Sequence, residues 1–170
     1  LAQAALKKSE LEELRELSEI LNYDYTEEEF DVVTADITSF DGSNWTNIFT
    51  IDCGTESGIE AGDVVICGDG LIGKISDAGD GWAKVVSVID DGTKVSFMVA
   101  RDRKLLGVVE GNQQGNINGY MLKGDANIAE GDIIITSGMA TYPAGLEIGT
   151  IQTITYNSDS RTTFTRKLFS

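Results

Sequence analysis

The fold of this chain is decided by a stretch that occurs twice, first as GDVVICGDGLIGKI at residues 62–75. The second copy, at residues 131–151, reads GDIIITSG, then a short insert, then AGLEIGTI. In each copy a β-branched run follows Gly-Asp, and a glycine-bearing turn leads into a second apolar segment. β-branched residues suit a pleated, buried surface, and glycine supplies the positive φ that tight turns need. The repeat predicts one hairpin in each of two similar β domains, with Gly73 and Gly149 at a bend or a close backbone approach.

The first copy also matches two nucleotide-binding patterns. Residues 68–73, GDGLIG, fit the dinucleotide fingerprint, and the lysine that follows nearly completes a phosphate-binding loop. Both motifs require a helix directly afterwards, because its N-terminal amides hold the phosphate. Here Ile75 stands where that loop needs Ser or Thr, and Gly79 and Gly81 would break the helix. We therefore interpret the stretch as a hairpin and expect no cofactor.

Composition excludes several functional classes. The chain has 170 residues, 41% of them hydrophobic, with 19 glycines and one proline, as many short strands joined by turns would need. Its net charge of −15 disfavours nucleic acid and anionic lipid as partners. No apolar run is long enough to span a membrane, so any membrane anchor is expected outside this sequence.

Residues 1–22 differ from everything that follows. They contain no glycine or proline and are rich in good helix formers. Leu14, Leu17 and Leu21 form a narrow stripe with a charged reverse face. Such a stripe favours a parallel coiled-coil dimer with these leucines as its seam. The alternative is an amphipathic helix packed on its own domain.

After an acidic junction, short strand candidates follow one another to the end of the chain. We predict a mainly β fold: a coiled-coil helix and junction at 1–25, then small β-barrel domains at 26–91 and 92–170. The predicted strands cover 30–37, 46–52, 62–67, 71–77, 83–89, 93–101, 104–110, 116–122, 132–136, 146–156 and 162–169. Several alternate apolar and polar residues, as in Lys94-Val95-Ser96-Phe97, which indicates one buried and one wet face.

The sequence contains no pattern typical of an active site. Histidine is absent, which removes the usual base of serine hydrolysis and the commonest zinc ligand. Many aspartates, Asp63, Asp69 and Asp132 among them, stand beside glycines, where this residue favours turns through local hydrogen bonds. We expect no catalytic, cofactor-binding or metal-binding residues. Cys53 and Cys67 are expected to be buried free thiols, with a disulfide as the alternative.

Aromatic residues in predicted turns are candidates for a partner-binding surface. They are Phe40, Trp45 and Tyr142. The alternative is that such rings cap the end of their own barrel.

Two blocks of motifs, in matching order, resemble a known family. In the first half they are SNW at 43–45, FTIDCG at 49–54, GIEAGD at 58–63, GLIGKI at 70–75 and VIDD at 88–91. In the second half they are GDIIITSG at 131–138 and YPAGLEIGT at 142–150. Together they are similar to the rod shape-determining protein MreC family over about residues 30–156.

The resemblance implies a single-pass protein of the cell membrane whose coiled coil and two β barrels lie on the extracytoplasmic side. It further implies a non-enzymatic homodimeric scaffold that links membrane components of the cell-elongation machinery to a penicillin-binding transpeptidase. The membrane helix would precede Leu1, and the family usually continues beyond Ser170 with a Pro-containing segment and a further strand. Two other functions stay open: a periplasmic adaptor of an export system and a carboxylate-based cell-wall hydrolase.

Overall fold

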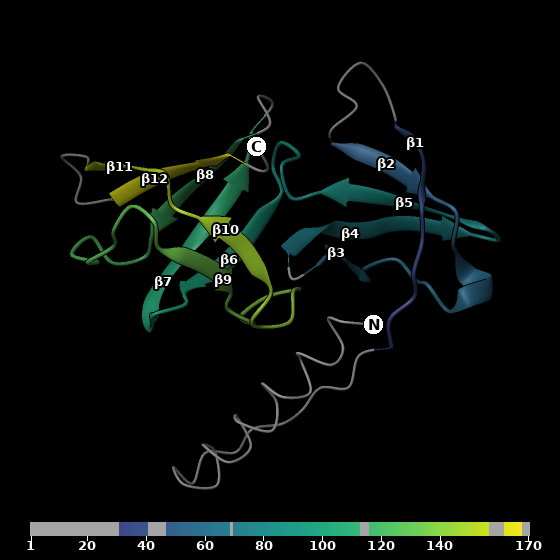
Figure 1. Ribbon diagram of the computed structural model, residues 1–170, viewed down its shortest axis with the longest axis horizontal. Coiled ribbons are helices and arrows are strands. Elements are labelled where there is room, and N and C mark those ends of the chain that lie inside the picture. Colours follow the sequence, from purple (N-terminus) through teal and green to yellow (C-terminus); the bar gives the residue numbers. More distant parts are fainter. Residues whose placement is uncertain (1–30, 41–46, 69, 113–115, 157–161, 168–170) are drawn as a thin grey trace, which may run out of the picture. The chain divides into compact units, whose positions relative to one another are not determined.

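The computed structural model describes residues 31–40, 47–68, 70–112, 116–156 and 162–167 (Figure 1). The chain divides into two units, Leu1–Val33 and Thr34–Ser170, and every described strand belongs to the second. The predicted helix at 1–22, with its leucine seam, lies outside the described residues. The domain limits predicted at 25/26 and 91/92 stay predictions.

The described part of the second unit is built almost entirely of β-strands, which confirms the predicted mainly β class. A single short 3-10 turn, η1 (Thr55–Ser57), interrupts them. The strands are β1 (Ile37–Phe40), β2 (Ile48–Ile51), β3 (Val64–Cys67), β4 (Gly70–Gly79), β5 (Trp82–Ser87), β6 (Lys94–Val99), β7 (Asp102–Gly111), β8 (Asn116–Met121), β9 (Ile133–Thr136), β10 (Glu147–Thr150), β11 (Thr153–Tyr156) and β12 (Thr162–Lys167).

These strands join into one open sheet, which corrects the expectation of two closed barrels. Their order is β1-β2-β5-β4-β10-β9-β6-β7-β8-β12-β11, with β3 paired to β4 off this path (Figure 1). β4 and β10 join the two halves through a parallel pairing of Gly70 with Glu147. The path ends at β1 and β11, and among the described strands nothing pairs these two ends with each other.

Both copies of the repeat form the predicted hairpins, and they also share a backbone hydrogen-bond pattern. β3 pairs antiparallel with β4, and β9 pairs antiparallel with β10. In the first copy the Gly62 N–H donates to the Ile75 carbonyl and the Ile75 N–H donates to the Asp63 carbonyl, both at 2.8 Å. The second copy makes the same two bonds, at 2.8 and 2.9 Å, with the equivalent residues Gly131, Ile151 and Asp132. The strand–turn–strand interpretation is confirmed, and no helix follows Lys74.

The predicted bends at the two hairpin glycines have different physical origins. At Gly73, an added Cβ would fall 2.9 Å from the Ser87 Cα and closer still to the Val86 carbonyl oxygen, so a neighbouring backbone occupies the space. At Gly149 the reason is conformational, because its φ of 143° lies in the region that favours glycine. Gly73 is required because β5 leaves no room for a side chain, and Gly149 is required because of its positive φ.

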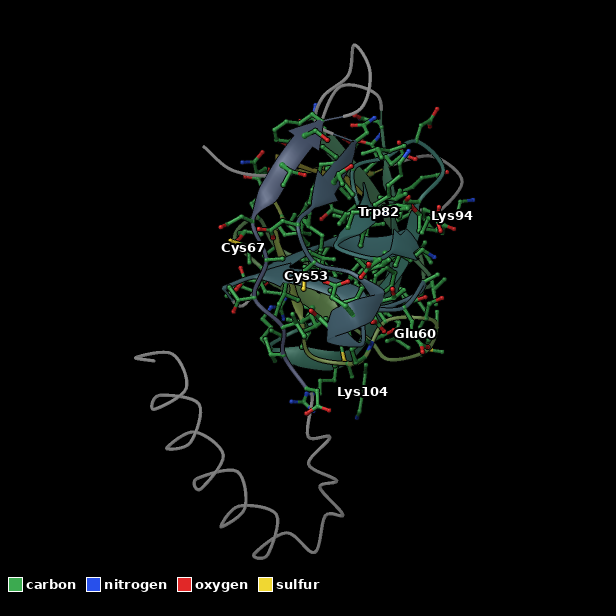
Figure 2. The ribbon with its side chains drawn as sticks, turned by 90° about the vertical axis from the view of Figure 1, so that its right-hand side faces the viewer. Cys53, Glu60, Cys67, Trp82, Lys94 and Lys104 are labelled. Carbon is green, nitrogen blue, oxygen red and sulfur yellow. The ribbon has the colours of Figure 1, made fainter. Side chains whose placement is uncertain are left out.

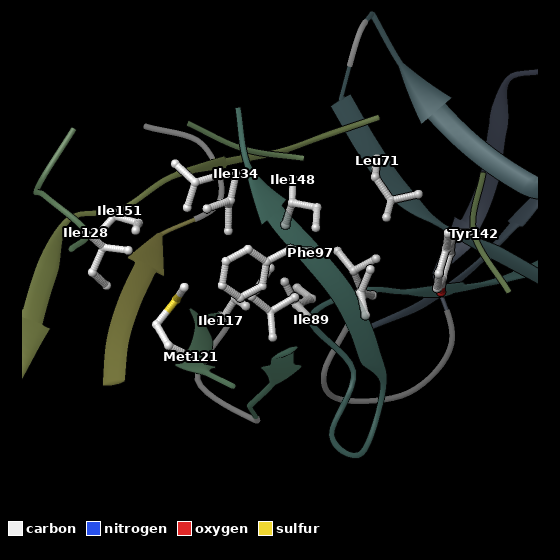
Figure 3. Packing of buried hydrophobic residues seen from close by; sticks show 14 of the residues in the cluster. Leu71, Ile89, Phe97, Ile117, Met121, Ile128, Ile134, Tyr142, Ile148 and Ile151 are labelled. Atoms are coloured by element: carbon white, nitrogen blue, oxygen red, sulfur yellow. The ribbon is translucent and has the colours of Figure 1, made fainter. Parts of the chain in front are cut away.

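Buried residues alternate with exposed ones along the strands, as the two-residue period of a strand requires. The buried side chains pack into two hydrophobic clusters. The smaller cluster includes Phe49 of β2, Ile75 of β4 and Val85 of β5. At the centre of the larger cluster, Phe97 of β6 has 0% of its surface exposed (Figure 3). The larger cluster also takes Leu71, Val88 and Ile89 from the first half of the chain. The two halves therefore share hydrophobic packing as well as the contact between β4 and β10.

Two predicted strands differ from the observed ones. The segment predicted at 30–37 is not a strand over 31–36; β1 begins at Ile37, where Ile51 of β2 becomes its ladder partner. The strand predicted at 146–156 is divided into β10 and β11, because the chain changes partner from β9 to β12 at that point. Apolar periodicity finds the extended segments but does not show which neighbour each one pairs with.

Candidate partner-binding surface

The aspartates at the start of the two hairpins take part in turns. No group of three or more His, Cys, Asp or Glu side chains in the described residues could hold a metal ion. The Asp63 carboxylate accepts from the Glu60 N–H at 2.8 Å, and the Asp132 carboxylate accepts from the Ala129 N–H at the same distance. Each aspartate thus closes the turn that leads into its hairpin, as local hydrogen bonding by turn aspartates predicts. These two carboxylates therefore act as hydrogen-bond acceptors for backbone N–H groups.

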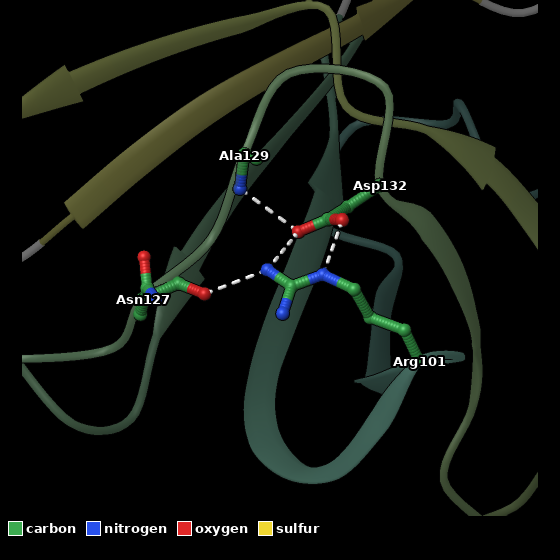
Figure 4. Close-up of polar contacts among 4 residues, drawn as sticks. All are labelled: Arg101, Asn127, Ala129 and Asp132. Atoms are coloured by element: carbon green, nitrogen blue, oxygen red, sulfur yellow. Dashed lines mark hydrogen bonds and ion pairs between the residues drawn. The ribbon is translucent and has the colours of Figure 1, made fainter.

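Asp132 differs from Asp63 in having an arginine partner (Figure 4). The Arg101 guanidinium donates to both Asp132 carboxylate oxygens, from Nε at 2.6 Å and from Nη2 at 2.7 Å. Nη2 also donates to the Asn127 carbonyl oxygen at 2.7 Å, so Arg101 ties two segments of the second half together. The Asp132 side chain is only 8% exposed and the Arg101 side chain is 48% exposed, so the carboxylate is covered while the guanidinium still contacts water.

The pair also sets the acidity of the carboxyl group. Hydrogen bonds from Arg101 are the main cause that holds the pKa of Asp132 below its ordinary value; burial opposes them and the Ala129 N–H supports them. Asp132 is therefore a fixed negative charge, neutralised within the fold. Such a carboxylate suits a structural role better than proton transfer, which needs a pKa near the working pH.

Glu56 performs a similar structural task in the first half. Its carboxylate accepts from the Gly54 N–H at 3.0 Å and from the Gly81 N–H at 2.6 Å, which joins η1 to the turn between β4 and β5. The bond from the Gly81 N–H is the largest cause that lowers the pKa of Glu56. An added Cβ at Gly54 would meet the backbone of Gly79 and Trp82, so these two turns pack backbone against backbone.

The structure describes two of the three aromatic residues that the sequence singled out, and these two differ in exposure. Phe40, at the end of β1, is 47% exposed, and its ring centroid lies 6.2 Å from that of Phe49. Trp45 lies outside the described residues. Tyr142 is only 5% exposed and belongs to the larger core cluster, on the side of Leu71 (Figure 3). In this conformation Tyr142 is a packing residue with no surface for a partner, whereas Phe40 has one.

Tyr142 fixes the loop between β9 and β10 from the inside. Thr136 closes the base of this loop, since its hydroxyl donates to the Pro143 carbonyl and accepts from the Leu146 N–H. The hydroxyl of Tyr142 itself is buried without a hydrogen-bond partner in the structure, and burial raises the pKa of this phenol. The ring thus stabilises the fold by apolar packing, and the buried hydroxyl without a hydrogen bond offsets part of that stabilisation.

Other exposed apolar residues escaped the sequence-based search. Trp82 begins β5 and is 37% exposed, packed beside Gly79 at the tip of a hairpin (Figure 2). Met139 is exposed in the loop that Tyr142 anchors, and Ile37 is exposed on β1. The signal that could have found Trp82 is the short turn at Asp80-Gly81, which places the next residue at a hairpin tip.

The two cysteines are free thiols, and only one of them is buried. Cys53 belongs to the smaller core cluster, as expected, whereas Cys67 at the end of β3 is exposed (Figure 2). The expectation of two buried thiols is therefore wrong for Cys67, because the last two residues of β3 lie outside the core. In the part of the chain that the structure describes, no helix has the length and apolar character needed to span a membrane.

Comparisons with known proteins agree with this architecture. Residues 37–168 match the family model for rod shape-determining protein MreC, barrel core. The cell shape-determining protein MreC of Listeria monocytogenes is 29% identical over 156 residues, covering 89% of this chain and 52% of that relative. The chain thus spans about half the length of the curated relative it matches.

Solved structures show the same fold. An MreC structure from Listeria monocytogenes superposes with a TM-score of 0.78 at 26% identity, covering 98% of this chain and 83% of that one. MreC of Pseudomonas aeruginosa gives a TM-score of 0.73 at 22% identity, over 80% of this chain and 89% of that one. MreC in a complex with penicillin-binding protein PBP2 from Helicobacter pylori gives 0.63 at 18% identity, over 80% and 86%. Because the family model covers most of the sequence, the chain belongs to the rod shape-determining protein MreC family.

Proposed function

We propose that this chain is part of a non-enzymatic scaffold that maintains cell shape by organising peptidoglycan synthases outside the cytoplasmic membrane. The observation that carries the proposal is the family match over residues 37–168. The site geometry supports it, because Asp63, Asp132 and Glu56 all serve the backbone or an internal ion pair. The family match does not favour the export adaptor or the cell-wall hydrolase.

The proposal extends to parts of the protein that this sequence does not include. In this proposal the protein is anchored in the cell membrane by a single helix upstream of Leu1, and its β-strands lie on the extracytoplasmic side. Its first 22 residues form the end of a coiled coil, and the β unit that follows is the part that holds partners. Tethering to one membrane raises the effective concentration of such partners, so modest affinity is enough.

A penicillin-binding transpeptidase is the partner we propose first. The support is the Helicobacter pylori complex, in which an MreC of the same fold is bound to penicillin-binding protein PBP2. Other membrane components of the elongation machinery are proposed as further partners. Phe40 and Trp45 are the proposed contact residues, since aromatic side chains often dominate interface energy.

The dimer seam gives the first test. Burying a leucine contributes about 1.5–3 kcal/mol, so Leu14, Leu17 and Leu21 are enough for a weak dimer when the upstream helix is also present. Light scattering on the chain extended towards the membrane is expected to show a dimer, and Leu14→Glu combined with Leu21→Glu is expected to give a monomer. A dimer that survives both substitutions would reject this seam.

The scaffold role is tested in a rod-shaped bacterium depleted of its own MreC. The full-length protein is expected to restore rod shape and to capture a penicillin-binding transpeptidase from solubilised membranes. Phe40→Ala combined with Trp45→Ala is expected to reduce both, because truncating a hot-spot residue costs about 2 kcal/mol or more. Trp82→Ala is the matched control, an aromatic truncation at the tip of the β4–β5 hairpin.

Two results would contradict this proposal. One is restored rod shape without any captured transpeptidase. The other is turnover of cell-wall fragments by the purified protein that Asp69→Asn abolishes while the fold is unchanged. The second result would favour the hydrolase interpretation, in which a carboxylate performs the chemistry.

A further inference from the structure

Positive charge is concentrated in one part of this acidic chain. Residues 93–126, which contain β6, β7 and β8, carry five lysines and arginines against three aspartates and glutamates, a net charge of +2. The rest of the chain therefore carries −17. The three strands are neighbours in the sheet, so the segment is also one region in space. Because salt screens exposed charges beyond about 10 Å at 0.1 M, a small partner on this region meets mainly its local charge.

Two of the five basic side chains in this region are paired within the fold. Lys94 lies 3.7 Å from the Glu110 carboxylate, and Arg101 is bound to Asp132. Three others are exposed and form no ion pair with any residue that the structure describes: Arg103, Lys104 and Lys123. Lys104 stands at the opposite end of the sheet from Lys94 (Figure 2). Positive charge without an internal partner is thus gathered at one end of β7.

Two leucines lie beside these unpaired basic side chains. The Leu122 N–H donates to the Leu106 carbonyl at 2.9 Å, which makes the two residues cross-strand neighbours. The adjacent pair, Gly107 and Met121, is buried, so alternation places both leucines on the outer face of the sheet. Lys104, two residues before Leu106 on β7, shares that face. Leu122 is 56% exposed, and neither leucine belongs to a core cluster.

We propose that this surface binds an acidic segment of a partner protein that also carries apolar side chains. The surface, named here the β7–β8 surface, consists of Lys104, Leu106, Leu122 and Lys123. The partner's carboxylates meet the two lysines, and its apolar side chains cover the exposed part of Leu122. The inference rests on the proposed scaffold role and gives it a second contact surface with a stated chemistry.

The leucines favour a protein segment over other anions. A phosphate polymer offers charge but no apolar side chain to cover Leu122. An anionic bilayer is broad enough to meet the −17 carried by the rest of the chain and would be repelled by it. Two carboxylates adjoin the surface, those of Asp102, which accepts the Lys104 N–H at 3.1 Å, and of Asp125. Binding is therefore expected to be weak and to fall as salt is added.

Two peptides of equal charge test the surface. The leucine peptide is acetyl-Glu-Glu-Leu-Glu-Leu-Glu-Glu-amide, and the serine peptide has serine in place of both leucines. In NMR titrations of the wild-type chain, the leucine peptide is expected to shift the amide signals of Leu106, Leu122 and Lys123. It is also expected to bind about tenfold more tightly than the serine peptide, because its leucines bury apolar surface. Equal affinities, or shifts confined to other strands, would overturn the proposal.

A pair of lysine variants separates the β7–β8 surface from net charge. Lys104→Gln combined with Lys123→Gln is expected to weaken binding of the leucine peptide by about tenfold, because both complementary charges are removed. Lys74→Gln combined with Lys84→Gln makes the same change in net charge on β4 and β5 and is expected to leave the affinity unchanged. Thermal melting checks that both variants fold. Equal weakening by the two variants would show a general charge effect and reject the surface.

A second copy of this chain and a non-protein anion are the competing occupants. Sedimentation of the peptide-free chain is expected to show no association that depends on Lys104 and Lys123. Association lost with Lys104→Gln and Lys123→Gln, but kept with Leu14→Glu and Leu21→Glu, would assign the surface to another copy and overturn the proposal. Polyphosphate or phosphatidylglycerol vesicles that bind as tightly as the leucine peptide would also overturn it.

The peptide tests and the shape test can fail separately. If the leucine peptide does not bind and the full-length protein still restores rod shape, the inference about the β7–β8 surface is wrong and the scaffold role stands. If the peptide binds as expected and rod shape is not restored, the scaffold role is wrong for this chain, and the partner inference that rests on it is rejected as well.

Discussion

Gly73→Ala is expected to destabilise the chain by about 3 kcal/mol, at the upper end of what overpacking costs in a well-packed site. The new Cβ would clash with the Val86 carbonyl oxygen and the Ser87 Cα. Both are backbone atoms of β5 residues that pair with β4. A side chain could rotate away from an added methyl group, but these backbone atoms cannot move without disturbing the ladder.

Gly70→Ala is the control for this prediction, because Gly70 lies on the same strand. An added Cβ there would meet only the Cys67 carbonyl oxygen, at 3.4 Å, which is an ordinary contact distance. Urea unfolding of both variants measures the difference through the shift in midpoint at unchanged slope. Equal stabilities of the two alanine variants would contradict the requirement for a close backbone approach at Gly73.

The sequence predicts the hairpins well because their determinants are local. The Gly-Asp start, the β-branched run and the turn glycine lie within a few residues of one another, and the structure repeats even their hydrogen bonds. Alternation also places Val95 and Phe97 in the core, as predicted. Strand partners depend on residues far along the chain. The pairing of Gly70 with Glu147, which joins the halves into one sheet, has no local signal.

The candidate surface shows the same limit. An aromatic residue in a loop is recognisable from sequence, but the direction of its ring depends on how the loop closes. Thr136 closes the β9–β10 loop and Tyr142 is buried, whereas Phe40 ends an edge strand and stays exposed. The exposure of Phe40 follows from the position of β1 at the end of the sheet, which a pattern of residues does not reveal.

Asp63 and Asp132 illustrate why equivalent residues can carry different weight. Both stand at the same position of the repeat, and both close a turn by accepting an N–H three residues earlier. Only Asp132 is shown with an arginine partner, and that partner comes from a residue 31 positions away. Sequence similarity between the copies therefore predicts the turn and misses the ion pair.

This difference yields the second large prediction. Asp132→Asn is expected to reduce the free energy of unfolding by about 1.5–3 kcal/mol at neutral pH, as for loss of a hydrogen bond to a charged group. The amide cannot accept both guanidinium bonds, and Arg101 loses the carboxylate to which it is hydrogen-bonded. Asp63→Asn, at the exposed equivalent position, is expected to cost less. Chemical denaturation of the two variants beside the wild type makes the comparison.

The pH dependence separates the ion pair from simple packing. Because the pKa of Asp132 is lowered in the folded chain, its contribution is complete above the ordinary carboxyl value of about 4 and is lost as the pH falls through the folded value. The gap in stability between wild type and Asp132→Asn is therefore expected to be constant near neutral pH and to narrow in acid. A gap that stays the same at every pH would show that Asp132 acts by shape alone. Both asparagine variants are expected to keep rod shape if they fold, because neither carboxylate is proposed to perform chemistry.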